Sequence, residues 1–130
     1  MQNIWTTKAI EVSAADAWSL LSNPQYWPTW GPSVRSVELD GGLIEKGATG
    51  TLTTTLGPRL RFEITSYDEG SRWAWKIAGV EATDHRVKPL TEGRCQVGFG
   101  VPWIAAPYLA VCQIALKRIR TMAEEPEVTQ

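Results

Sequence analysis

Short runs in which every second residue is apolar constrain the fold of this chain more than any other feature. Leu60, Phe62 and Ile64 alternate with charged or hydroxyl side chains. Successive side chains of a strand point to opposite faces of a sheet, so this pattern predicts a half-buried β-strand. The same alternation recurs at 73–77 and at 94–101.

Turn signals separate these runs. Asp40-Gly41-Gly42, Gly57-Pro58 and Thr91-Glu92-Gly93 each interrupt the apolar pattern, and residues of these types favour tight turns. Strands joined by such short connections pair in antiparallel fashion. We predict strands at 2–12, 34–39, 51–56, 60–65, 73–77, 80–88 and 94–101.

Helical signals lie near the two ends of the chain. Ser13 is a favourable N-cap for a helix at 14–21, and Asp16 lies three residues later, at the capping-box position. Asn23-Pro24 ends that helix, and a short helical turn is expected at 24–27.

The last predicted element is a long helix at 103–123, and Pro107 in its first turns marks a place where the regular helix can begin. At 100° per residue, one apolar stripe of this helix contains Ile104, Tyr108, Val111, Ala115, Ile119 and Met122. Leu109 and Leu116, seven residues apart, form a second apolar line beside the stripe.

The order of elements predicts an α+β fold, in which an antiparallel sheet carries helices on one face. The length predicts one domain over 1–130, with a frayed tail at 124–130. The space between the sheet and the long helix either fills with side chains or becomes a pocket.

Seven tryptophans are the most unusual element of the composition. They are Trp5, Trp18, Trp27, Trp30, Trp73, Trp75 and Trp103. A buried indole N–H needs a hydrogen-bond partner, so this number indicates either a very aromatic core or the wall of a space for an apolar guest. We assign Trp5, Trp18 and Trp103 to packing and the other four to the wall or rim of a pocket.

Composition argues against several classes of function. The net charge is −1 with no long basic run, so no nucleic-acid partner is expected. Cys95 and Cys112 belong to no metal-ligating cluster, which predicts buried, reduced thiols and no metal or cofactor site. The uncharged segment 97–116 contains glycines and prolines, which predict a strand followed by a helix rather than a membrane span. No secretory signal is visible, and the expected location is cytoplasmic.

Three segments together resemble one known family. They are VSAADAWSLLSNPQYWPTWGPSV at 12–34, YDEGSRWAWKI at 67–77 and DHRVKPLTEGRCQVGF at 84–99. With the closing helix, they are similar to the START-like (SRPBCC) superfamily of polyketide cyclases, dehydrases and lipid-transport proteins. The resemblance implies a helix-grip fold, in which a curved sheet of six to seven strands wraps around the C-terminal helix and two short helices follow the first strand. It also implies a cavity for a hydrophobic ligand.

His85 is the only histidine of the chain and the weak candidate for a catalytic residue. An imidazole in an apolar pocket can act as a general base or hydrogen-bond a ligand carbonyl, although a purely structural histidine is also compatible with the sequence. Thr83 and Glu81 are expected on the same strand face. Glu81 could orient His85 or act as an acid or base itself, while Tyr108 could offer its hydroxyl to a guest.

These expectations define three hypotheses of function. The first is the binding of a small hydrophobic or aromatic molecule. The second is a cyclase or dehydratase that uses the same pocket, with His85 as proton shuttle. The third is a protein- or membrane-interaction module or a homodimer, formed through Leu109 and Leu116. The predicted ligand-binding residues are Trp27, Trp30, Phe62, Trp73, Trp75, Thr83, His85, Phe99 and Tyr108.

Overall fold

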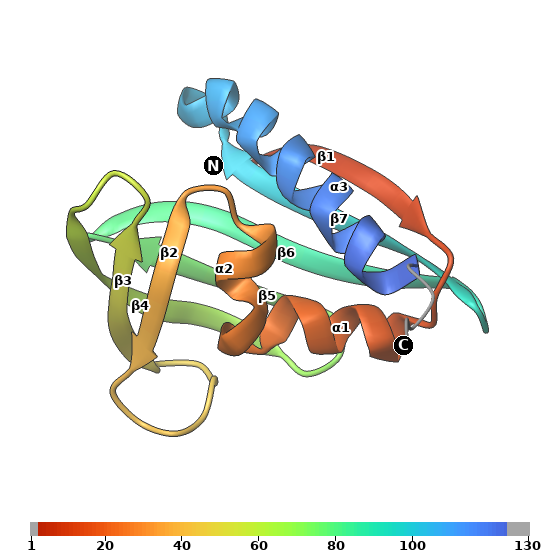
Figure 1. Cartoon of the computed structure of the whole chain (residues 1–130), viewed down its shortest axis with the longest axis horizontal. Helices are drawn as coiled ribbons and strands as arrows, with labels where there is room; N and C mark the ends of the chain where they lie inside the picture. The colour runs from red at the N-terminus through yellow and green to blue at the C-terminus, as the bar shows by residue number, and fades with distance from the viewer. Residues whose placement is uncertain (1–2, 125–130) are drawn as a thin grey trace, which may run out of the picture.

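Seven antiparallel strands form one curved sheet, and the helices cover its concave face (Figure 1). The computed structural model describes residues 3–124. The strand order across the sheet is β1-β7-β6-β5-β4-β3-β2. The strands are β1 (Asn3–Ile10), β2 (Val34–Leu39), β3 (Thr49–Thr54), β4 (Arg59–Asp68), β5 (Arg72–Ile77), β6 (Val80–Thr91) and β7 (Arg94–Pro102).

The helices follow β1 and close the chain. They are α1 (Ala14–Ser22), the 3-10 helix η1 (Pro24–Tyr26), α2 (Trp27–Trp30), the 3-10 helix η2 (Trp103–Tyr108) and α3 (Leu109–Glu124). α3 packs on β1 and β7, and both α1 and α2 contact it. This arrangement confirms the predicted helix-grip architecture.

The predicted strands all form, with shifted ends. β3 covers residues 49–54 rather than 51–56, because the chain turns at Gly57, whose φ is +116°. β6 continues to Thr91, beyond the expected end at residue 88. Residue 2, the predicted start of the first strand, and residues 125–130 of the predicted frayed tail lie outside the described residues.

The regular part of the closing helix begins close to Pro107, as the sequence allowed, and not at residue 103. Residues 103–108 form a 3-10 helix with a non-helical backbone at Ala105, and the regular helix begins at Leu109. Pro107 explains the break, because proline lacks the N–H that an α-helical turn requires. Ile104 consequently leaves the predicted inward stripe and is 75% exposed. Trp103 is 61% exposed, so the packing role assigned to it is wrong.

The second apolar line on this helix is not a surface. Leu116 is fully buried, whereas Leu109 is half-buried. The buried face of α3 is therefore wider than the predicted stripe, and it includes Cys112 as well as Ala115 and Ile119. The proposed interaction surface through Leu116 is thus wrong.

Tryptophan side chains cap the C-terminal end of α1. Ser13 begins this helix as predicted, and its side chain accepts a hydrogen bond from the Asp16 backbone N–H. At the other end, the last carbonyls of a helix have no partner inside the helix. Indole N–H groups supply such partners: Trp30 donates to the Leu20 carbonyl, while Trp27 and Trp73 both donate to the Leu21 carbonyl.

A tight hairpin joins β5 and β6, the two strands that carry most of the candidate site. Ile77 pairs with Val80, and both residues between them, Ala78 and Gly79, have positive φ angles. Two consecutive positive φ values are typical of a type I′ turn, which prefers Asn-Gly. Ala78 adopts this conformation at a steric cost, because its Cβ approaches the backbone.

Replacing Ala78 with asparagine should therefore stabilise the fold. We expect Ala78→Asn to raise the free energy of unfolding by about 0.5–1 kcal/mol, since asparagine tolerates the left-handed conformation better. Ala78→Val is the matched control and should lower it, because a β-branched residue is disfavoured at positive φ. Urea denaturation measures both, and a stability order in which valine equals or exceeds asparagine would contradict the strained turn.

Candidate functional site

A cavity of about 340 Å³ lies between the sheet, α2 and the closing helical segment. Ligand pockets usually measure about 300–1,000 Å³, so the space suits a small molecule. Its aromatic lining consists of Trp27, Trp30, Trp75, His85, Phe99 and Tyr108. The larger aliphatic side chains that line it are those of Val34, Leu52, Leu60, Ile77, Val101 and Val111.

The aromatic side of the cavity is a continuous stack. The rings of Trp27 and Trp73 are nearly parallel with centroids 4.7 Å apart, and the His85 ring stacks on the other side of Trp73 at 3.7 Å. Trp75 meets Trp73 edge-on at 5.0 Å. Such contacts stabilise the wall beyond the area that they bury.

Two predicted ligand-binding residues stand behind the wall rather than on it. Trp73 is completely buried between Trp27 and His85, and Phe62 is buried against Trp27 and Trp75. Neither side chain lines the cavity. They support the residues that do, because they hold the lining rings in place. The other seven predicted residues all line the cavity.

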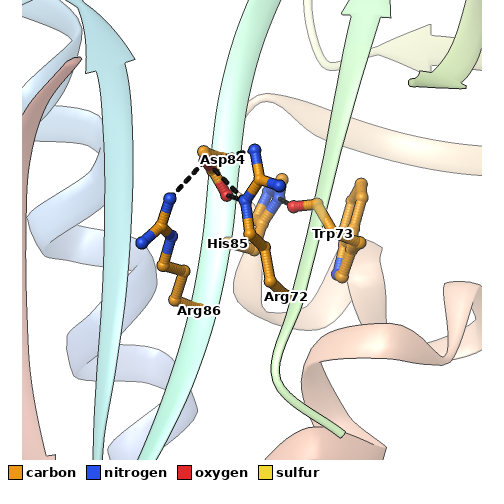
Figure 2. Close-up of polar contacts among 5 residues, drawn as sticks. All are labelled: Arg72, Trp73, Asp84, His85 and Arg86. Atoms are coloured by element: carbon orange, nitrogen blue, oxygen red, sulfur yellow. Dashed lines mark hydrogen bonds and ion pairs between the residues drawn. The ribbon is translucent and has the colours of Figure 1, made fainter. Parts of the chain in front are cut away.

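His85 is held by its neighbours in one orientation. Figure 2 shows the Nδ1 atom hydrogen-bonded to the backbone carbonyl oxygen of Trp73, at 3.0 Å. A carbonyl oxygen only accepts, so Nδ1 carries the hydrogen. Burial lowers the pKa of His85 from 6.5 to about 3, because a charged ring is poorly solvated there. The ring is neutral near neutral pH.

The hydrogen bond to Trp73 corrects one role considered for His85, and burial weakens the other. A neutral ring has one N–H, and the Trp73 carbonyl already takes it, so His85 has no hydrogen left for a ligand carbonyl. A base with a pKa of about 3 is also a weak proton acceptor near neutral pH. His85 therefore does not fit the role of a proton shuttle at that pH.

The strand face predicted for Glu81 is wrong, and a β-bulge is the reason. Between the pairs Ala74–Asp84 and Lys76–Glu81, the pairing advances two residues on β5 but three on β6. The extra residue in β6 reverses the alternation beyond Thr83. Glu81 thus pairs opposite Lys76 on the outer face, at the rim of the cavity, and it is exposed.

Two hydroxyl groups predicted to meet a ligand are already hydrogen-bonded. Thr83 is buried, and its Oγ1 accepts from the Trp75 indole N–H at 2.8 Å. The Tyr108 hydroxyl lies 2.8 Å from Oγ of Ser33, which ties the start of the closing helix to the segment before β2. Desolvation raises the pKa of Tyr108. Both residues position the cavity wall.

An ion-pair cluster fixes the outer face of β6 behind the cavity. Asp84 is buried and accepts from Nε of Arg72 at 3.0 Å, while Arg86 lies on its other side at 3.4 Å (Figure 2). Arg72 and Arg86 are directly opposite in the sheet, so the carboxylate offsets the repulsion between them. Arg86 also covers the ring of Trp5, which packs over Gly100.

Several lining residues escaped the sequence analysis. Val111 and Ala115 were predicted to face inward on the closing helix but were not assigned to the site. Ser33 and Ala105 had no local signal, because only the fold brings them to the cavity. Cys95 and Cys112 are free and buried, as predicted. None of the helices within residues 3–124 has the length and apolar character that a bilayer crossing requires.

Comparisons with known proteins agree with this architecture. The model of a family described as polyketide cyclase / dehydrase and lipid transport matches residues 1–121. No curated protein matches the sequence significantly.

Solved structures share the fold at low sequence identity. The protein XoxI from Bacillus cereus is 17% identical with a TM-score of 0.78, and the match covers 98% of this chain and 99% of that one. The Aha1 dimer from Colwellia psychrerythraea is 16% identical with a TM-score of 0.70, and the match covers 98% of this chain and 100% of that one. Norcoclaurine synthase from Thalictrum flavum, in complex with dopamine and hydroxybenzaldehyde, is 15% identical with a TM-score of 0.65. That match covers 98% of this chain and 88% of the synthase chain.

The buried histidine predicts a specific loss of stability in acid. In the unfolded chain His85 takes up a proton below pH 6.5, whereas in the folded chain it does so only near pH 3. The unfolded state therefore binds more protons within this window, and stability falls as the pH falls. The slope from this group is at most about 1.4 kcal/mol per pH unit.

Comparison with His85→Phe isolates this contribution. The variant keeps an aromatic ring beside Trp73 but has no titrating group at this position. Chemical denaturation between pH 7 and pH 4 should give a steeper loss of stability for the wild type than for the variant. Equal slopes would contradict a neutral, buried His85.

Proposed function

Because the chain belongs to the polyketide cyclase/dehydrase and lipid-transport family, we propose that it binds a small apolar or aromatic molecule between its sheet and α3. The observation that carries this proposal is the cavity of about 340 Å³ with its largely apolar lining. Burying about 200 Å² of apolar ligand surface there is worth roughly 5 kcal/mol before the entropy of association is subtracted.

The rigidity of the aromatic wall supports binding. Trp27 and Trp30 are buried, and their indole N–H groups are tied to the end of α1. A wall that needs no rearrangement loses little conformational entropy when a ligand arrives. Aromatic faces also suit flat, aromatic guests, which stack on them or meet them edge-on.

Binding is better supported than catalysis of the cyclase or dehydratase kind. The enzyme hypothesis assigned proton transfer to His85, whose pKa of about 3 makes it a weak base near neutral pH. Norcoclaurine synthase, which shares the fold, binds aromatic compounds, and this likeness favours an aromatic guest for the present chain. Any reaction here would need another acid or base.

Filling the cavity should weaken binding without unfolding the protein. Val111 lines the cavity from α3, whereas Gln113, on the same helix, is exposed. We expect Val111→Phe to weaken the binding of a neutral aromatic probe such as naphthalene by roughly tenfold, which corresponds to about 1.4 kcal/mol of overpacking. Gln113→Phe is the matched control and should bind like the wild type.

Two measurements test this expectation. The first is the equilibrium partition of the probe between buffer and protein. The second is the midpoint of thermal unfolding, which rises when a ligand binds the folded state. If a broad set of apolar probes neither binds nor shifts the midpoint of the wild type, the proposed function is wrong. Equal binding by the two variants would place the ligand elsewhere.

A further inference from the structure

The cavity has no charged side chain directed into it within the described part of the chain. Glu81 is the one residue with a charged side chain that borders it, and its register opposite Lys76 places it on the outer face. Transfer of a charged ligand from water into this apolar space would lose hydration with no counterion in return. The lining therefore favours an uncharged guest.

His85 nevertheless gives the cavity a fixed hydrogen-bond acceptor. Its Nδ1–H is taken by the Trp73 carbonyl, so the other ring nitrogen, Nε2, carries a lone pair. Within residues 3–124, no donor hydrogen-bonds this nitrogen. His85 itself lines the cavity, and Nε2 is the ring atom with hydrogen-bonding capacity left for a guest.

The orientation of this acceptor is fixed by packing. The imidazole stacks on Trp73 at 3.7 Å, and it meets the edges of Phe99 at 5.0 Å and Trp30 at 6.2 Å. A ring held on three sides needs no reorganisation to accept a hydrogen bond. A guest that offers no hydrogen leaves the nitrogen lone pair unpaired, which is costly in an apolar space.

We propose that the cavity selects an uncharged aromatic or alicyclic molecule whose hydroxyl or N–H group donates a hydrogen bond to Nε2 of His85. This inference rests on the proposed binding function and adds the polarity of the ligand. It also reverses the direction of the contact expected from the sequence, since His85 accepts a hydrogen bond from the guest instead of donating one to a guest carbonyl.

Matched probes of similar shape test the proposal. They are 2-naphthol, which donates a hydrogen bond, 2-methoxynaphthalene, which cannot, and 2-naphthoate, which is charged. Near neutral pH, we expect the wild type to bind 2-naphthol roughly tenfold more tightly than 2-methoxynaphthalene, and 2-naphthoate most weakly. His85→Phe should keep its affinity for 2-methoxynaphthalene and lose the preference for 2-naphthol. Thr121→Ala, which removes an exposed hydroxyl of α3 outside the cavity, should retain that preference.

The single histidine permits a second, independent measurement. With ¹⁵N-labelled histidine, the two ring nitrogens of the wild type give separate signals in NMR spectra. We expect a protonated Nδ1 and an unprotonated Nε2 in the free protein, and a shift of the Nε2 signal on adding 2-naphthol but not 2-methoxynaphthalene. This measurement stands even if His85→Phe fails to fold.

The possible outcomes separate the two proposals. Equal binding of 2-naphthol and 2-methoxynaphthalene, tightest binding of 2-naphthoate, or a protonated Nε2 would overturn the role of His85 while leaving the binding function intact. Retention of the 2-naphthol preference by His85→Phe would do the same. Failure of every apolar probe to bind would overturn the binding function itself.

Discussion

The C-terminal end of α1 is where the fold and the cavity depend on each other. Two carbonyls at this end, those of Leu20 and Leu21, accept three indole N–H groups from Trp27, Trp30 and Trp73. A helix end without partners is unstable in a buried position, and so is a buried indole N–H. Each requirement satisfies the other, and the result fixes α1, α2 and β5 relative to one another.

The chemistry of the cavity follows from this arrangement. Trp73 is fixed at its indole nitrogen by α1, stacks on Trp27 with one face and stacks on His85 with the other. Its backbone carbonyl then sets the tautomer of the same histidine. A residue that does not line the cavity therefore determines which polar group of His85 remains unpaired. The apolar surroundings keep the imidazole uncharged, because they penalise the imidazolium more than the neutral ring.

The sequence predicted the fold well because the fold depends on local patterns. Alternation at Leu60, Phe62 and Ile64 and turn residues such as Gly57 determine strands and connections within a few residues. Failures occurred where the backbone departs from a regular element. The inward stripe was extended to Ile104 although Pro107 marks a later start of the regular helix, and one extra residue in β6 reversed the face of Glu81. The apolar periodicity from which the faces were assigned records neither departure.

The sequence predicted most residues that line the cavity but not their hydrogen bonds. Trp75 was predicted in the wall and Trp27 and Trp30 at the rim, and all three line the cavity. The division between Trp75, which lines the cavity, and Trp73, which lies behind it, depends on the stacking of α2 over β5. The direction of the His85 hydrogen bond depends on a carbonyl of the neighbouring strand, which a pattern of side chains does not record.

The two sides of the cavity have different freedom to change during evolution. On the side of α1 and β5, the lining tryptophans also complete hydrogen bonds of the core. Substitutions there therefore change the cavity and destabilise the fold at the same time. On the side of α3, Val111 and Ala115 border the space with short side chains, which form no hydrogen bonds of their own. Substitutions at these helical positions change the size and shape of the space without removing a hydrogen bond of the aromatic side. The volume of the cavity can therefore change while the core keeps its hydrogen bonds.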